Sequence, residues 1–317
     1  MWEVTNPKLF VDTAQKQQLT GVGAIGLLLL VLLLSVFDAG VVVATCFFGL
    51  ALIFGMTGWL GFAVTVVAGI IAMGIPGVDS LWYLERSWSV LLFGCFATIT
   101  MFFPNSFFLE RAIGTLGMTL VIVSVFFLLD YEWWYRTDEM VSQGIMSNIN
   151  RSLDIFRQMD SEMIIQRDLS ATALQLAGYQ SRLFPALLGL SSLASMAVAW
   201  WGYIGLSGEK LRSLTGLSEF KFNDHLVWCL ICGLLFLVSD VGEGWSRVGE
   251  NLVFFMVSLY VLRGAAVFLV TTGILFFGKV SLFIGLIFLA PVVLTIAFLI
   301  GLSDTWFDYR NRVRILS

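Results

Sequence analysis

Long apolar segments recur along almost the whole chain and are separated by short polar breaks. A helix that crosses a bilayer needs about 20 mainly apolar residues, with a range of roughly 17–25. The breaks within residues 21–75 are short, so this region forms either three spans or two spans with a bent, partly re-entrant segment. We therefore expect eight or nine spans, at 21–37, 40–57, 59–75, 87–104, 112–129, 183–206, 225–240, 250–273 and 280–302.

One long polar segment, 130–182, interrupts this pattern. Its apolar residues recur at steps of three and four, which places them on one face of a helix. Three interpretations stay open: a surface helix resting on the chain's own transmembrane bundle, a docking face for a partner protein, or disorder. The residues predicted to dock a partner are Ile149, Leu153, Phe156 and Met163, and Ile145 and Met159 continue the same face.

These patterns predict an all-α fold, a polytopic transmembrane helical bundle with an amphipathic helical insertion. Only helices and closed barrels satisfy their backbone hydrogen bonds in lipid, and the apolar segments have helical length. The chain divides into an N-terminal polar segment (1–20), an N-terminal transmembrane bundle (21–129), the amphipathic loop (130–182), a C-terminal transmembrane bundle (183–303) and a basic tail (304–317).

Lysine and arginine near the ends of the spans indicate orientation, because cytoplasmic loops carry an excess of them. The 130–182 loop and the C-terminal tail are separated by four expected spans, so both lie on one side. Both are rich in arginine, whereas the intervening segments carry few basic residues. We therefore expect the loop and the C-terminus to be cytoplasmic. The side of the N-terminus depends on whether there are eight or nine spans.

Composition supports the same class of protein and excludes others. Of 317 residues, 58% are hydrophobic and only 13% are charged, which excludes a water-soluble globule. The formal charge of −4 provides no basic surface for nucleic acid. No phosphate-binding glycine loop, nucleophile elbow or pair of intramembrane carboxylates is present. We expect a protein that is not an enzyme, has no cofactor and has the lipid bilayer, and other membrane subunits, as partners.

Arg263 is the clearest single feature, because it lies near the middle of the 250–273 span. A charged side chain there costs about 2.5–3.5 kcal/mol on insertion scales, so it needs a partner or a wet cavity. Tyr260 and Thr271 share its helical face. Three interpretations remain: an internal salt bridge, a binding site for an anionic ligand group, or snorkelling to the interface. The candidate counter-ions are Asp38, Asp240, Asp304 and Asp308.

A second group of polar residues precedes the 225–240 span. Asn223 or Asp224 is a natural N-cap for that helix. His225, the single histidine, shares a helix face with Cys229 and Cys232. A metal site needs about three or four protein ligands, and no further histidine exists to complete one, so we expect a capped helix start and no metal.

Several segments of the second half form a recognisable pattern. They are Arg182-Leu-Phe-Pro-Ala-Leu-Leu, Ala199-Trp-Trp, Glu219-Phe-Lys-Phe-Asn-Asp-His-Leu-Val-Trp228, Asn251-Leu, Leu259-Tyr-Val-Leu-Arg-Gly-Ala-Ala-Val267 and Gly301-Leu-Ser-Asp-Thr-Trp-Phe-Asp-Tyr-Arg310. Together they resemble the YybS-like family of uncharacterised bacterial membrane proteins. The family has no established biochemical activity and is distantly similar to the substrate-binding S components of energy-coupling-factor transporters. The likeness implies a bacterial inner-membrane protein with Arg263, Tyr260, Asn251 and Asp304 at a ligand cavity.

Two functions follow from these observations. The first is a small-solute-binding or transport-associated subunit, similar to S components, with Arg263 lining the site. The second is a non-transporting scaffold or accessory subunit of a cell-envelope complex. Transport predicts a polar cavity around Arg263 that opens to one side. A scaffold predicts a dry bundle in which Arg263 is fully paired to an aspartate.

Overall fold

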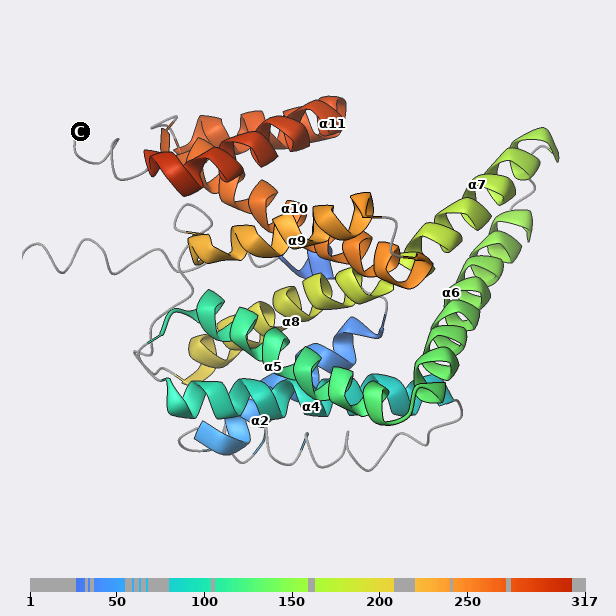
Figure 1. Cartoon of the computed structure of the whole chain (residues 1–317), viewed down its shortest axis with the longest axis horizontal. Coiled ribbons are helices and arrows are strands. Elements are labelled where there is room, and N and C mark those ends of the chain that lie inside the picture. Colours follow the sequence, from blue (N-terminus) through green and yellow to red (C-terminus); the bar gives the residue numbers. More distant parts are fainter. Residues whose placement is uncertain are drawn as a thin grey trace, which may run out of the picture.

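A computed structural model gives the fold of this chain. The residues it describes are 27–31, 34, 37–54, 59, 63, 67, 80–103, 106–158, 163–207, 220–239, 242–271 and 275–309. Within these ranges all regular structure is helical, as the sequence predicts (Figure 1). The helices are α2 (Ala39–Phe54), α4 (Ser80–Phe102), α5 (Phe108–Leu129), α6 (Glu132–Gln158), α7 (Met163–Arg182), α8 (Phe184–Ser207), η2 (Asp224–Leu226), α9 (Val227–Val238), α10 (Glu243–Thr271) and α11 (Leu275–Phe307).

Four described helices are long and apolar enough to cross a membrane. They cover Phe108–Leu129, Phe184–Leu206, Glu243–Phe268 and Leu289–Phe307. They overlap the spans expected directly before and directly after the 130–182 loop and the expected spans 250–273 and 280–302, with the ends of the last two displaced along the chain. α2 and the η2–α9 segment are apolar helices of shorter length. Most of spans 21–37 and 59–75 lies outside the described residues.

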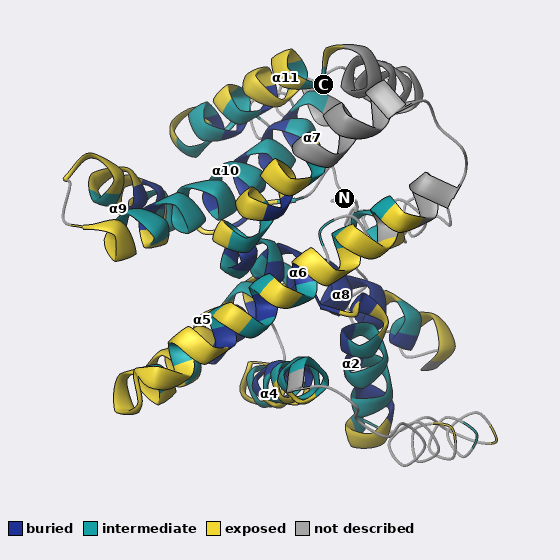
Figure 2. Ribbon diagram, turned by 90° about the vertical axis from the view of Figure 1, so that its right-hand side faces the viewer, coloured by how far each residue is buried: buried dark blue, intermediate teal, exposed yellow. Residues whose placement is uncertain are grey.

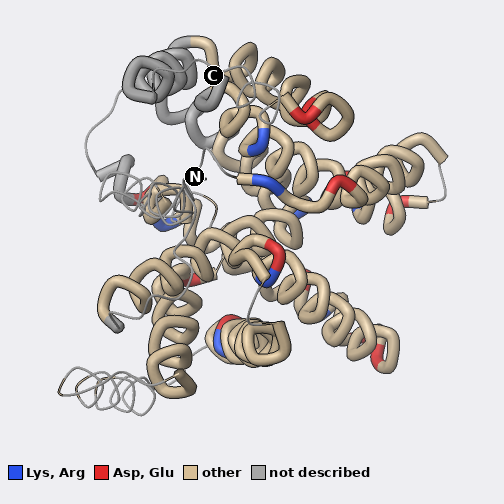
Figure 3. Tube along the Cα trace, turned by 90° about the vertical axis from the view of Figure 1, so that its left-hand side faces the viewer, with Lys and Arg blue, Asp and Glu red and all other residues tan. Residues whose placement is uncertain are grey.

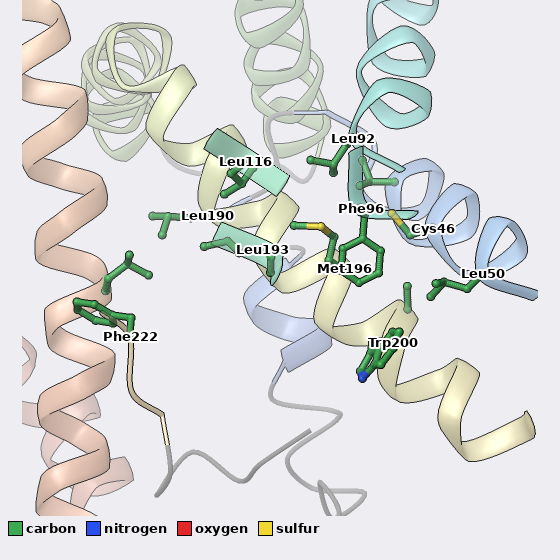
Figure 4. Close-up of a cluster of buried hydrophobic side chains, with 14 of the residues drawn as sticks. Cys46, Leu50, Leu92, Phe96, Leu116, Leu190, Leu193, Met196, Trp200 and Phe222 are labelled. Carbon is green, nitrogen blue, oxygen red and sulfur yellow. The ribbon is translucent and has the colours of Figure 1, made fainter. Parts of the chain in front are cut away.

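Helix α8 is the centre of the bundle. It contacts α2, α5, α7 and α10, and it is mostly buried where the other helices cross it (Figure 2). Ser191, Ser195 and Ala199 are small residues spaced four apart on one face of α8, and all three are buried. Met196 and Trp200 extend from the same helix into a core that α2, α4 and α5 complete (Figure 4). Small side chains therefore admit close neighbours while large ones fill the space between them.

Helix α5 has the surface expected of a helix that faces lipid. Its apolar side chains on the outward face are well exposed, from 39% at Met118 to 82% at Leu128. The charged residues occupy few positions along the helices of the bundle (Figure 3). Apolar side chains exposed over a whole helix are costly in water, and they are stable against acyl chains.

Helices α6 and α7 form a hairpin that rises at one end of the bundle and extends past it (Figure 1). The 27 residues of α6 give it a length of about 40 Å. Near its base, Val141 and Ile145 are buried against Phe37 and Phe184. This part of the amphipathic segment therefore rests on the chain's own bundle.

The hairpin corrects one detail of the sequence prediction. The apolar repeat continues without interruption through 145–163 and predicts one docking face. In the structure α6 ends at Gln158 and α7 begins at Met163. Met163 therefore lies on the other arm of the hairpin from Ile149, Leu153 and Phe156. The steps of three and four happen to continue across the break, so periodicity alone cannot detect it.

Glycines set the spacing of α9, α10 and α11. A Cβ atom added at Gly264 would lie 1.7 Å from the Ala297 carbonyl oxygen, and one added at Gly301 would lie 2.0 Å from the Tyr260 carbonyl oxygen. Gly233 and Gly249 make a similar contact between α9 and α10. Helices cross this closely only where no side chain stands between them. The glycine pair between α10 and α11 fixes the geometry of the site described next.

Candidate functional site

The candidate site is a cluster of charged side chains at the crossing of α10 and α11. Gly264 and Gly301 bring the two backbones into contact there. Arg263 precedes the first glycine, and Asp304 lies one turn beyond the second. The close crossing therefore places the arginine of one helix beside the aspartate of the other.

Arg263 and Asp304 form a fully buried ion pair. The Arg263 Nε atom donates to Asp304 Oδ2 at 2.9 Å, and both side chains are 0% exposed. The second oxygen of Asp304 accepts a hydrogen bond from the Tyr309 backbone N–H at 3.0 Å. Of the four counter-ions that the sequence left open, the structure places Asp304 here, whereas Asp308 pairs with Lys221 and Asp38 lies at the start of α2. Asp240 lies outside the described residues.

Asp224 is a second counter-ion, which the sequence did not identify as one. Arg263 Nη1 donates to Asp224 Oδ1 at 2.7 Å, and 47% of the Asp224 side chain is exposed. The neighbouring Asn223 is the N-cap, because its side chain accepts a hydrogen bond from the His225 backbone N–H. This distinguishes the two N-cap candidates: Asn223 closes the turn, and the Asp224 carboxylate pairs with Arg263.

One nitrogen of the Arg263 guanidinium has no acceptor among the described residues. This nitrogen, Nη2, is buried. The hydroxyl groups of Tyr260 and Thr305 lie next to each other in the same cluster, and both are buried without a well-formed hydrogen bond to any described residue. A buried donor without a partner costs about 1–3 kcal/mol. The cluster therefore has hydrogen-bonding capacity that the protein does not use.

Aromatic rings enclose the charged groups. The Phe222 ring lies 5.3 Å from the Arg263 guanidinium carbon. Tyr260 packs edge-to-face against Phe222 and against Phe298. With one arginine and two aspartates, the cluster carries a formal charge of −1. It is a small charged site with apolar walls, and Asp224 is its half-exposed member.

The structure brings together three of the four predicted ligand-binding residues, namely Arg263, Tyr260 and Asp304. Asn251 is twelve positions earlier on α10, about 18 Å along the helix axis. Its side-chain oxygen accepts from the Ala186 backbone N–H, and its amide donates to the Arg182 carbonyl oxygen. Asn251 therefore holds α10 to the start of α8.

Asn251 belongs to a second polar cluster at the base of the hairpin. Arg247 makes two hydrogen bonds to the Asp138 carboxylate on α6, at 2.9 and 2.6 Å. It also donates to the Ser181 carbonyl oxygen, at 2.9 Å. Arg182 pairs with Glu250 beside it. The pairing is balanced in charge, and it ties α6 and the α7–α8 junction to α10.

The predicted docking residues have different surroundings. Ile149 is partly buried and packs against the chain's own core beside Leu81 and Trp88. Leu153 is also partly buried. The side chains of Phe156 and Met163 lie outside the described residues.

A cavity of about 250 Å³ lies between the start of α2, α4 and α6. Asp38 and Glu85 line it, and the Asp38 backbone N–H donates weakly to Glu85 Oε1 at 3.4 Å. Burial raises the pKa of Glu85 and is the largest effect. The hydrogen bond from the Asp38 backbone N–H opposes it, the Asp38 carboxylate raises the pKa by a smaller amount, and Arg86 lowers it slightly. No group of three His, Cys, Asp or Glu side chains that could hold a metal ion is found within the described ranges.

Comparison with protein families, with curated proteins and with solved structures finds no match to this chain. The resemblance to the YybS-like family therefore stays a prediction.

Sequence reasoning missed two kinds of functional residue. It assigned Asp224 as an alternative N-cap, although two candidate caps in a row leave one of them free for another role. It also passed over Gly264 and Gly301, although a glycine directly after an intramembrane arginine is a signal of close helix crossing.

Proposed function

We propose that this chain is an integral membrane protein that binds a small solute at the Arg263 cluster, as the solute-binding or transport-associated subunit of a transporter. The observation that carries the proposal is the buried Arg263 Nη2 group, which has no hydrogen-bond partner among the described residues. A ligand acceptor beside Nη2 would satisfy it.

A purely structural arginine is a less complete explanation. A structural ion pair is stable when hydrogen bonds satisfy all its donors, because an unpaired buried polar group is costly. Here Asp304 alone is fully buried, and Asp224 is half exposed. Intramembrane ionisable residues commonly mark the paths of substrates or ions. The half-exposed end of the cluster gives a solute its route to the arginine.

We also propose an arrangement in the membrane, which the sequence and the four long apolar helices support. We place eight or nine spans in a bacterial inner membrane, with the α6–α7 hairpin and the C-terminus in the cytoplasm. The arginine content of the loop and tail supports this orientation. The likeness to S components supports a subunit that captures a solute and passes it to other membrane subunits, and this support is by analogy.

The test is native mass spectrometry of the protein released gently from its own membrane. The wild-type chain should retain a small molecule in stoichiometric amount, and Arg263→Lys should lose it while staying folded. Lysine preserves the positive charge and lacks the planar fork of arginine. Asp308→Asn is the matched control and should retain the ligand. A wild-type protein without any small ligand would contradict the proposal.

A second candidate function is a scaffold or accessory subunit of an envelope complex. The projection of the α6–α7 hairpin past the bundle supports it (Figure 1). Leu153 lies on α6 beyond the part that rests on the bundle. Under this alternative, Leu153→Ser reduces the recovery of a partner in cross-linking experiments, whereas Ser147→Ala on the exposed side of α6 leaves it unchanged. Equal recovery with both variants would argue against a scaffold.

A further inference from the structure

We infer that the solute bound at Arg263 carries a carboxylate, and that Asp224 occupies the place of this carboxylate when the site is empty. The inference rests on the proposed function and adds the chemical class of the ligand. Asp224 then acts as an internal competitor that leaves the guanidinium when the solute arrives.

The geometry of the guanidinium carries the first step. Its Nε atom is bound to Asp304, so the edge formed by Nη1 and Nη2 is the one that remains for another group. Asp224 accepts from Nη1 alone, and Nη2 has no partner in the part of the chain that the structure describes. A planar carboxylate can accept two parallel hydrogen bonds from such an edge. A free carboxylate would therefore satisfy both nitrogens, which the tethered one does not.

The second step concerns exposure. Asp304 is 0% exposed and is held on both oxygens, by Arg263 and by the Tyr309 backbone N–H. Asp224 is 47% exposed and lies in a short turn at the start of α9. Moving Asp304 would leave two buried groups unpaired. Moving Asp224 returns an already hydrated carboxylate to water, so Asp224 is the exchangeable partner.

The third step is conservation of charge. One arginine and two aspartates give the cluster a formal charge of −1. When a monocarboxylate takes the place of Asp224, the guanidinium again contacts two carboxylates, and the displaced Asp224 charge moves into water. A neutral solute would leave the Arg263–Nη1 position without an anion. A cation would meet the guanidinium directly. The exchange therefore favours an anionic group of the same shape as the one it displaces.

The test compares carboxylate probes in protein reconstituted in phosphatidylcholine nanodiscs. The probes are acetate and benzoate, with acetamide and benzamide as neutral analogues of the same shape. Binding is read from the rise of the unfolding temperature with probe concentration. The wild-type chain should bind the carboxylates and not the amides. Asp224→Asn should bind them about tenfold more tightly, as expected if Asp224 occupies the site about nine-tenths of the time.

Matched variants separate this effect from general electrostatics. Asp308→Asn removes one negative charge near the same end of α11, and Asp308 pairs with Lys221 instead of Arg263. Its φ of 44° is a conformation that asparagine adopts readily. It should bind the probes as the wild type does. Arg263→Lys should lose binding, and Asp224→Ser should reproduce the gain if the asparagine variant folds poorly.

The outcomes distinguish the two proposals. If Asp224→Asn binds carboxylates no better than the wild type, Asp224 is not a competitor and the inference is wrong. If native mass spectrometry finds a neutral ligand that depends on Arg263, the proposed function stands and the carboxylate assignment fails. If binding occurs only in nanodiscs that contain phosphatidylserine, the carboxylate belongs to a lipid headgroup and the soluble-solute assignment is overturned.

Discussion

At the residue scale, two aspartates share one arginine and differ in exposure. Asp304 is sealed between α10 and α11, whereas Asp224 borders solvent. Breaking a buried ion pair by removing one partner costs about 3–5 kcal/mol, because the other charge is left uncompensated. Asp224 is half exposed, so water already screens part of its interaction with the buried arginine. Loss of Asp224 should therefore cost less than loss of Asp304.

This difference predicts unequal effects on stability. Asp304→Ala should lower the free energy of unfolding by about 3–5 kcal/mol. Asp224→Ala should lower it by less, about 1–3 kcal/mol, because it leaves one buried nitrogen of Arg263 without an acceptor and removes a carboxylate that is already half exposed. Reversible unfolding in mixed micelles measures both. Equal losses would show that Asp224 is as deeply integrated as Asp304, and would remove the basis for its exchange.

Glu85, which precedes the expected 87–104 span, predicts a dependence on pH. Its pKa is raised, mainly by burial, so the folded state favours the protonated carboxyl. This contribution to stability is complete below the ordinary pKa of glutamate and is lost as the pH rises through the raised value. Wild-type stability should therefore fall over that window relative to Glu85→Gln in unfolding experiments at a series of pH values. Parallel curves for the two proteins would refute it.

Single residues could be interpreted from the sequence where their type is rare in its surroundings. An arginine inside an apolar span needs a partner, and Asp304 was among the few acidic candidates. Asp224 was hidden because the contact joins residues 39 positions apart and its local pattern is that of a helix cap. Asn251 was grouped with Arg263 by resemblance, but its amide satisfies backbone groups at the α7–α8 junction.

At the element scale, α10 connects the two polar clusters. Arg247 and Asn251 near its N-terminus hold the base of the hairpin, and Arg263 lies farther along the same helix. Close contacts at Gly249 and Gly264 fix its position against α9 and α11. α10 runs as one continuous helix from the first cluster to the second.

Glycine contacts between α10 and α11 predict the largest effect of a single methyl group. Gly264→Ala would place a Cβ atom 1.7 Å from the Ala297 carbonyl oxygen, so the helices must separate and the Arg263–Asp304 pair must lengthen. We expect destabilisation of about 2 kcal/mol or more, in the range of overpacked cores.

Gly117→Ala on α5 is the control, because no atom lies within 4 Å of the added Cβ. It should be neutral or stabilising by up to about 1 kcal/mol. The same reversible unfolding assay in mixed micelles compares the two. Similar behaviour of both variants would contradict the close crossing.

The sequence predicted elements well where a single physical property determined them. Apolar length located α5, α8 and α10 within a few residues at most boundaries. The break between α6 and α7 was missed, because the apolar repeat continues through it. The base of the amphipathic face packs on the chain's own core through Val141 and Ile145, a tertiary contact that periodicity does not distinguish from docking to a partner.

At the scale of the whole molecule, apolar helices gather around α8, and the hairpin leaves the bundle at one end (Figures 1 and 2). This arrangement places the polar hairpin in water if the apolar helices lie in lipid. The orientation is a separate prediction, which depends on arginine content.

Labelling tests that orientation. Ser147 lies on the exposed side of α6, so Ser147→Cys, in a background with the four native cysteines replaced by alanine, should react with a membrane-impermeant maleimide in inside-out vesicles only. Reaction in intact spheroplasts would place the hairpin outside the cell and reverse the proposed topology.

We propose above that Arg263 is a binding group and that its Nη1 and Nη2 atoms donate to a ligand. The most direct measurement is an experimental structure of the gently purified protein in lipid nanodiscs, at a resolution that shows side chains. We expect a non-protein group within hydrogen-bond distance of Arg263 Nη2, with Asp224 turned toward solvent. A structure in which Nη2 donates to a protein oxygen, with Asp224 still in place, would contradict it and make the cluster a structural one.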